Sequence, residues 1–164
     1  MTGFKFKQFE IHQDRCAMKV GTDGVLLGAW APGGKRILDV GSGTGLISLM
    51  MAQRFPEAQV LGIDMDGEAC EEAAENVAAS PFADRVGIEC CRLQDFHSEE
   101  SFDAIVSNPP FFLNSLKNPD SKRTMARHTD SLPFRDLFRG AKMLLSDDGV
   151  FSVIVPSEVL EVVV

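Results

Sequence analysis

A short apolar run, a glycine turn and a second apolar run constrain the fold of this chain more than any other stretch. Residues 37–48 read Ile-Leu-Asp-Val-Gly-Ser-Gly-Thr-Gly-Leu-Ile-Ser, which predicts a buried strand, a tight turn and the start of a helix. Glycines at 41, 43 and 45 permit a positive φ and leave no side chain where the backbone must approach a ligand closely. Such a turn is typical of a site for a nucleotide-like molecule.

Strands and helices alternate along the rest of the chain. Further strands are predicted at 59–63, 86–90, 102–107 and 150–155, after a first at 35–40. Helices are predicted at 45–54, at 66–80 and from Pro133 to Leu145, and a turn is predicted at 146–149. Short apolar strands between helices indicate an α/β fold, a doubly wound Rossmann-like parallel sheet with helices on both faces.

The helix at 66–80 carries a predicted buried stripe and a predicted solvated face. The stripe follows the apolar helical spacing and comprises Cys70, Ala73, Ala74, Val77 and Ala78. The solvated face comprises Glu68, Glu71, Glu72 and Glu75.

The N-terminal segment, residues 1–34, is predicted to pack over the ligand site of a main domain at 35–164, although it could simply cover a sheet edge. Residues 4–11 alternate and suggest one short strand or extended arm, and residues 25–30 suggest a short helix. Thr22 and Asp23 could cap that helix or contact a cofactor.

Charge is unevenly distributed in this chain of 164 residues and net charge −8. Residues 57–103 hold thirteen acids and two bases, whereas residues 114–142 hold seven bases and three acids. The acidic total argues against a simple nucleic-acid binder, but the basic region is either a footprint for phosphates or a solvated face.

The cysteine pattern favours a reducing compartment. Four cysteines, at 16, 70, 90 and 91, form no Cys-x-x-Cys pair, and with three scattered histidines they show no metal-ligand spacing. We therefore expect free thiols and no metal. Because no signal peptide or membrane-spanning run is visible, we expect a cytoplasmic protein without a membrane partner.

Acidic residues after the predicted strands narrow the choice of ligand. Asp64 ends the second strand, where a carboxylate can accept hydrogen bonds from both hydroxyls of a ribose. Dinucleotide-binding folds and S-adenosylmethionine-dependent methyltransferases share this feature. The G-x-G-x-G spacing preceded by Asp39, and Asp95 after the third strand, are typical of the methyltransferases, whereas dinucleotide sites favour G-x-G-x-x-G.

The fourth strand ends in Ser107-Asn108-Pro109-Pro110-Phe111-Phe112. If it neighbours the first strand, Asn108 and the glycine turn face one crevice at the carboxyl edge of the sheet. The side-chain oxygen of Asn108 and the carbonyl of Pro109 could both accept from a planar NH2 group, and Phe111 or Phe112 could stack on its ring. A rigid loop is the alternative interpretation.

Several motifs of this sequence resemble those of known methyltransferase families. The glycine turn with Asn-Pro-Pro-Phe resembles the amino-methyltransferases that act on adenine N6, guanine N2 or glutamine amides. Residues 6–9 (Phe-Lys-Gln-Phe), residues 18–30 (which include Val-Gly-Thr-Asp) and Ala126-Arg127-His128 resemble the bacterial tRNA1(Val) adenine-N6 methyltransferases, which modify the adenosine 3′ of the anticodon. The resemblance covers nearly the whole chain.

The resemblance implies a class I methyltransferase sheet, with S-adenosylmethionine as cofactor and tRNA as substrate, and we expect a monomer. That family has further strands after the fifth, so we expect the sheet to be truncated here. The implied catalytic residues are Asn108, Pro109, Pro110 and Phe111. The implied cofactor-binding residues are Lys19, Thr22, Asp39, Gly41, Gly43, Gly45, Asp64, Met65, Asp95, Phe96 and Asn108. The implied substrate-binding residues are Phe111, Phe112, Arg127 and His128.

Other functions remain open from sequence alone. The same chemistry could act on an rRNA guanine or a protein glutamine. A catalytically idle RNA-binding module and a nicotinamide-dependent oxidoreductase are further alternatives. The tight glycine spacing disfavours the oxidoreductase, and the retained glycines, Asp64 and Asn108 disfavour the idle module.

Overall fold

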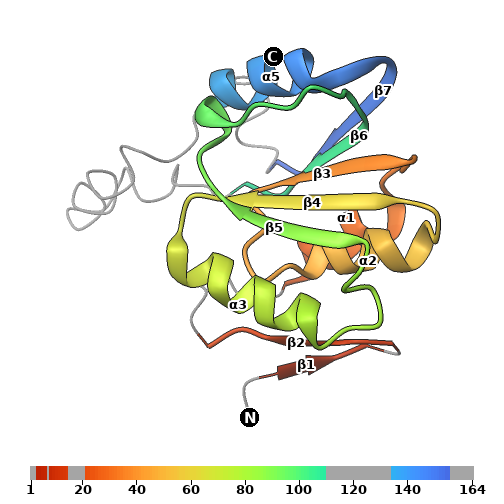
Figure 1. The fold of residues 1–164 in the computed structure, drawn as a ribbon, viewed down its shortest axis with the longest axis vertical. Coiled ribbons are helices and arrows are strands. Elements are labelled where there is room, and N and C mark those ends of the chain that lie inside the picture. Colours follow the sequence, from red (N-terminus) through yellow and green to blue (C-terminus); the bar gives the residue numbers. More distant parts are fainter. Residues whose placement is uncertain (1–2, 7, 15–20, 110–133, 156–164) are drawn as a thin grey trace.

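A parallel sheet lies at the centre of the described part of the chain, which in this computed structural model comprises residues 3–6, 8–14, 21–109 and 134–155 (Figure 1). Its five strands within those residues are β3 (Arg36–Val40), β4 (Gln59–Asp64), β5 (Val86–Cys90), β6 (Phe102–Ser107) and β7 (Leu145–Val153). They are ordered β5-β4-β3-β6-β7, and every neighbouring pair is parallel.

This order places a topological switch point between β3 and β6. From β3 the chain adds β4 and β5 on one side, and it then returns to add β6 and β7 on the other. The predicted doubly wound α/β sheet is therefore confirmed, and the first and fourth sheet strands are neighbours.

Helices cover the two faces of the sheet unequally. On one face lie α1 (Thr22–Trp30), α2 (Leu46–Arg54) and α3 (Gly67–Ala78), and on the other lie α5 (Phe134–Leu144) and the short 3-10 helix η1 (Leu93–Asp95) (Figure 1). Each face has its own apolar core, because alternate residues of a strand point to opposite faces. Thus Ile37 belongs to the α1–α2–α3 side and Leu38 to the α5 side.

The N-terminal segment differs from the single strand or arm predicted at 4–11. It forms two short antiparallel strands, β1 (Gly3–Lys5) and β2 (Glu10–His12), because the chain reverses between them. Ile11 is fully buried, and the ring of Phe9 packs edge-on against Phe82 at a centroid distance of 6.3 Å. The hairpin thus contributes to the core beneath α3 (Figure 1).

The predicted buried stripe of α3 is rotated in the structure. Ala74 and Ala78 are exposed, while Glu72 and Asn76 are each 1% exposed. The assignment of Glu72 to the solvated face was therefore wrong. The docking of β2 against α3 widens the buried side of the helix beyond its apolar residues, and a pattern based on hydrophobicity alone cannot anticipate this.

The predicted turn at 146–149 is also wrong, because these residues lie within β7. Phe102 pairs with Leu145 and Ala104 pairs with Val150, so β7 carries extra residues between two paired positions. A bulge of this kind absorbs turn-forming residues without ending the strand. The other sheet strands lie within one or two residues of their predicted positions, and β5 and β6 match them. In the parts described, no helix is long and apolar enough to cross a bilayer.

Candidate functional site

The glycine turn joins the end of β3 to the start of α2. Gly41, Gly43 and Gly45 have φ values of +76°, +52° and +88°, a region that side-chain-bearing residues rarely adopt. The backbone N–H groups of Gly41 and Ser42 donate to the carbonyl of Ile63 in β4, at 2.8 and 2.9 Å. The turn is thereby fixed to the carboxyl edge of the sheet.

A further glycine, Gly62 in β4, allows this turn to lie close to the strand. A Cβ atom at this position would lie 2.9 Å from both the Cβ of Ser42 and the Oγ of Ser48. These distances are shorter than ordinary carbon contacts, so a side chain here would displace the turn or α2.

Asp39 is a fully buried carboxylate two residues before the first turn glycine. Its Oδ2 accepts a hydrogen bond from Ser48 Oγ at 2.8 Å, whereas its Oδ1 has no partner among the described residues. The buried Oγ of Ser42 has none there either. Burial, with a smaller contribution from the nearby carboxylate of Asp64, raises the pKa of Asp39 to about 7 against the opposing effect of the hydrogen bonds to Ser48. Two unmatched polar atoms beside the turn are what a polar ligand group would satisfy.

Asp64 ends β4 and faces the same turn. Its Oδ2 accepts from the N–H of Gly43 at 2.8 Å, and its Oδ1 accepts from the N–H of Asp66 at 2.9 Å. Burial raises its pKa, and the two backbone donors partly offset that effect. Since each carboxylate oxygen has a further lone pair, Asp64 can still accept hydrogen bonds from two ligand hydroxyls.

Asn108 leaves the sheet beside the glycine turn. Val40 pairs with Ser107 across β3 and β6, and Ser107 Oγ donates to the Val40 carbonyl at 2.9 Å. Asn108 is half-buried, and a Cβ atom on Gly24 in α1 would lie 3.4 Å from its Nδ2. Pro109 is buried. The N-terminal helix, the turn and the Asn-Pro sequence therefore meet at one place, and the expected strand order had predicted this for the turn and Asn108.

Three further predicted site residues, Asp95, Met65 and Phe96, differ in how exposed they are. Asp95 is exposed in η1, and Met65 is 41% exposed directly after Asp64. The ring of Phe96 is buried in the core, 6.2 Å from that of Phe102. Several predictions lie outside the described residues: Lys19, Pro110, Phe111, Phe112, Arg127 and His128.

The capping role considered for Thr22 and Asp23 is wrong. Helix α1 begins at Thr22 itself, and its N-cap is Gly21, which makes no side-chain cap. Both side chains are exposed in the first turn.

Asn76 in α3 is a site residue that sequence reasoning missed. Its Oδ1 accepts from the His12 N–H at 2.9 Å, and its Nδ2 donates to the His12 carbonyl at 2.9 Å and to the Thr44 carbonyl at 2.8 Å. One buried amide thus joins the N-terminal hairpin to the glycine turn. No local pattern reveals this, because the partners are 64 and 32 positions away in sequence.

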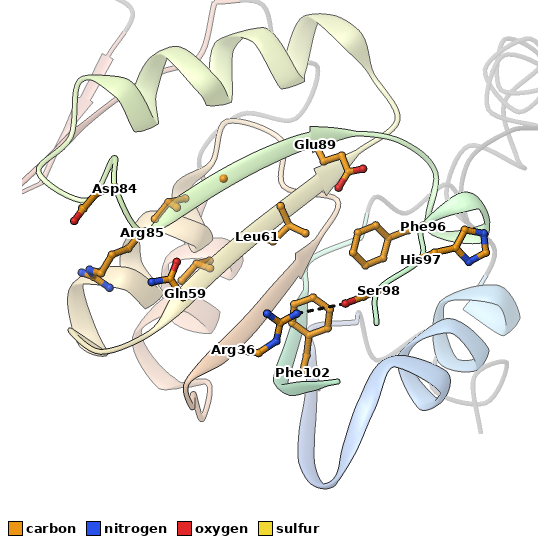
Figure 2. Close-up of a pocket in the computed structure, with 13 residues that line it drawn as sticks. Arg36, Gln59, Leu61, Asp84, Arg85, Glu89, Phe96, His97, Ser98 and Phe102 are labelled. Carbon is orange, nitrogen blue, oxygen red and sulfur yellow. Dashed lines mark hydrogen bonds between the residues drawn. The ribbon is translucent and has the colours of Figure 1, made fainter. Parts of the chain in front are cut away.

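A hollow of about 470 Å³ lies elsewhere, over the outer face of β4 and β5 (Figure 2). The two arginines that line it are already occupied. Arg36 binds Ser98, Glu100 and the Ser101 carbonyl, and its guanidinium lies 4.7 Å from the ring centroid of Phe102. Arg85 donates to three backbone carbonyls near the end of α2: Ala52, Phe55 and Ala58. We therefore assign the functional site to the glycine turn rather than to this hollow. The described residues contain no cluster of three or more groups suited to a metal ion.

Together, the strand order, the glycine turn and the paired ends of β3 and β6 define a class I methyltransferase fold. A solved S-adenosylmethionine-dependent methyltransferase from Thiobacillus denitrificans, in complex with S-adenosyl-L-homocysteine, shares this fold at a TM-score of 0.59. It is 18% identical and the match covers 84% of this chain and 50% of that one.

Sequence comparison is more specific. The family described as "Methyltransferase small domain" matches residues 20–161. The tRNA1(Val) (adenine(37)-N6)-methyltransferase of Phocaeicola vulgatus is 57% identical over 157 residues, which cover 94% of this chain and 67% of the relative. The enzyme of the same name from Bacteroides thetaiotaomicron is 50% identical over 161 residues, covering 96% and 68%. The chain therefore belongs to the methyltransferase small domain family and, within it, to the tRNA1(Val) adenine-N6 methyltransferases.

The buried Asp39 predicts a pH-dependent stability. Its folded pKa of about 7 lies above the unfolded value of 3.8, so the folded state holds a proton that the unfolded state releases between these values. The free energy of unfolding should fall as the pH rises through this window. Relative to wild type, Asp39→Asn should be equally stable near pH 4 and more stable, by roughly 2 to 4 kcal/mol, at pH 8. Urea unfolding at both pH values measures this, with the exposed Asp84→Asn as control, and parallel profiles for wild type and Asp39→Asn would contradict it.

The bridging amide predicts coupling between the hairpin and the turn. Asn76→Ala removes three hydrogen bonds and should lower the free energy of unfolding by about 2 to 4 kcal/mol. Hydrogen exchange should also quicken at the His12 amide and around Thr44, whereas Glu68→Ala on the exposed side of α3 should change neither. If the His12 amide stays as protected in Asn76→Ala as in wild type, this role is wrong.

Proposed function

We propose that this chain transfers the methyl group of S-adenosylmethionine to N6 of adenosine 37 in tRNA1(Val). The observation that carries the chemistry is the placement of Asn108 beside the glycine turn and Asp64 at one edge of the sheet. The substrate comes from the relatives named above, which are 50–57% identical over most of the chain.

The residues of the turn fit the cofactor. The unmatched Oδ1 of Asp39 is a buried acceptor suited to the ammonium of the methionine part, and a cation there would favour the ionised carboxylate. Asp64 offers its remaining lone pairs to the ribose hydroxyls, and the glycines at 41 and 43 leave room for close backbone approach. Exposed Asp95 is available to the adenine amino group. When bound, S-adenosylmethionine supplies an electrophilic methyl group on a positively charged sulfur.

Asn108 and Pro109 act on the acceptor amine. Two fixed carbonyl oxygens can accept both hydrogens of one exocyclic NH2 group, which holds the nitrogen in place and directs its lone pair away from them. The amine can release its proton during or after transfer, so no strong base is required of the chain. Catalysis then depends on positioning and electrostatics. The hydrogen bond from Ser107 to Val40 fixes the strand end from which Asn108 extends. A base in an RNA strand must be unpaired or flipped out to reach this edge.

The role of Asn108 is tested by separating cofactor binding from transfer. Asn108→Ala should reduce methylation of tRNA by at least about 100-fold, comparable with the loss of one oriented donor or acceptor in other enzymes. Its dissociation constant for S-adenosylmethionine should stay within about threefold of wild type, measured by calorimetry. A variant with near-normal turnover would remove Asn108 from the mechanism.

Asp64→Ala gives the converse result. It removes the acceptor proposed for the ribose and a partner of the Gly43 N–H, so S-adenosylmethionine should bind at least about tenfold more weakly. Turnover at saturating cofactor should fall less than affinity does. Asp84→Asn, far from the turn in sequence and exposed, is the control. Unchanged affinity in Asp64→Ala would exclude Asp64 from the ribose site.

A further inference from the structure

Helix α5 carries a stripe of exposed cations along an otherwise acidic protein. Arg135, Arg139 and Lys142 are exposed, while Leu137 and Ala141 on the opposite side are buried against the sheet. The spacing i, i+4, i+7 places the three cations on one side of the helix. With a rise of about 1.5 Å per residue, they follow one another at about 6 and 4.5 Å along the axis.

Within the described residues, these cations have no partner that would hold the fold together. Among the described residues, no ion pair or hydrogen bond joins Arg135, Arg139 or Lys142 to another group. By contrast, Arg54 donates to the carbonyls of Gly28 and Ala31, and the other core-facing arginines described above are similarly occupied. Among the described residues, the basic side chains that hold the fold together therefore have backbone partners, and the stripe has none there.

The acids described near the stripe are Asp136, Asp147 and Asp148, together with exposed Asp95 in η1, which packs against α5. Asp136 on the same helix is half-buried and accepts a hydrogen bond from Gln94 in η1 at 3.4 Å, so it is directed toward η1. Asp147 and Asp148 lie beyond the end of the helix and mark where the basic stripe ends. The exposed glutamates of α3 lie on the other side of the sheet from α5 (Figure 1).

The stripe begins near the functional site. The first turn of α5 contacts η1 through Asp136 and Gln94, and η1 follows β5 at the carboxyl edge of the sheet. A Cβ atom on Gly140 would lie 2.6 Å from the Cδ2 of Leu93, so helix and η1 are tightly packed. Arg135 thus lies toward the edge that carries Asp64 and Asn108, and Arg139 and Lys142 lead away from it.

We propose that the α5 stripe, Arg135, Arg139 and Lys142, binds successive phosphates of the RNA strand whose adenine enters the site. This proposal rests on the proposed function. Guanidinium groups match phosphate oxygens in charge and geometry, and phosphate contacts of this kind position a nucleic acid without reading its sequence. The whole chain carries a net charge of −8 even with the three cations of the stripe included, so the rest of the protein repels a polyanion and a local basic track would also orient the tRNA on the enzyme.

The test compares charge-neutral and charge-conserving variants of the full-length enzyme. The triple variant Arg135→Gln, Arg139→Gln, Lys142→Gln should raise KM for tRNA at least about tenfold near 0.1 M salt. It should also reduce the slope of log Kd for tRNA against log salt by about 2, the value for three lost contacts to a single strand. Turnover at saturating tRNA and the dissociation constant for S-adenosylmethionine should not change.

Two further variants keep the outcome interpretable. Arg135→Lys with Arg139→Lys retains the charges and should keep the salt slope of wild type, which a merely structural role would not explain. Lys35→Gln removes an exposed cation at the opposite edge of the sheet and should leave tRNA binding unchanged. A triple Gln variant with wild-type affinity and salt slope would overturn the α5 proposal while tRNA methylation by wild type stands. Failure of wild type to methylate tRNA would instead overturn the proposed function.

Discussion

The parallel pairing of β3 with β6 is the constraint on which the rest of this structure depends. It brings Val40 and Ser107 together across 67 positions of sequence, and the Ser107 hydroxyl joins the two strand ends directly. The glycine turn follows one strand and Asn108 follows the other, so the residues proposed for the cofactor and for the acceptor share one edge of the sheet. Reactions that depend on positioning need such an edge, because small displacements of an acceptor group greatly reduce the rate.

Most of the fold could be predicted from sequence because it arises from local patterns. Buried parallel strands appear as short apolar runs, and β5 and β6 match their predicted bounds. The errors arise where tertiary contacts override a local signal. Glu72 has the spacing of a solvated residue but is buried, and the turn-forming residues at 146–149 are accommodated as a bulge in β7. The N-terminal hairpin depends on docking against α3, which is distant in sequence.

Residues to propose for the site could be chosen from the sequence, but their electrostatic arrangement could not be foreseen. Sequence spacing singled out Asp39 near the end of β3, the glycines of the turn after β3, Asp64 at the end of β4 and Asn108 after β6. It could not show that Asp39 is fully buried and that its Oδ1 has no partner among the described residues. Because burial raises the pKa of Asp39, its ionised form destabilises the folded chain. A cationic ligand group beside the carboxylate would relieve this cost. Nor could it identify Asn76, whose bonds link two segments that have no sequence relationship. Such buried polar groups, stabilised by distant partners, are the part of a site that requires a structure.

The most direct test of this account is to locate the transferred methyl group. The full-length enzyme is incubated with isotopically labelled S-adenosylmethionine and total tRNA from cells that lack it, and nuclease fragments are mapped by mass spectrometry. The account predicts label in N6-methyladenosine at position 37 of tRNA1(Val). Label in a guanine, in a protein glutamine or nowhere, from a protein that binds S-adenosylmethionine, would contradict it.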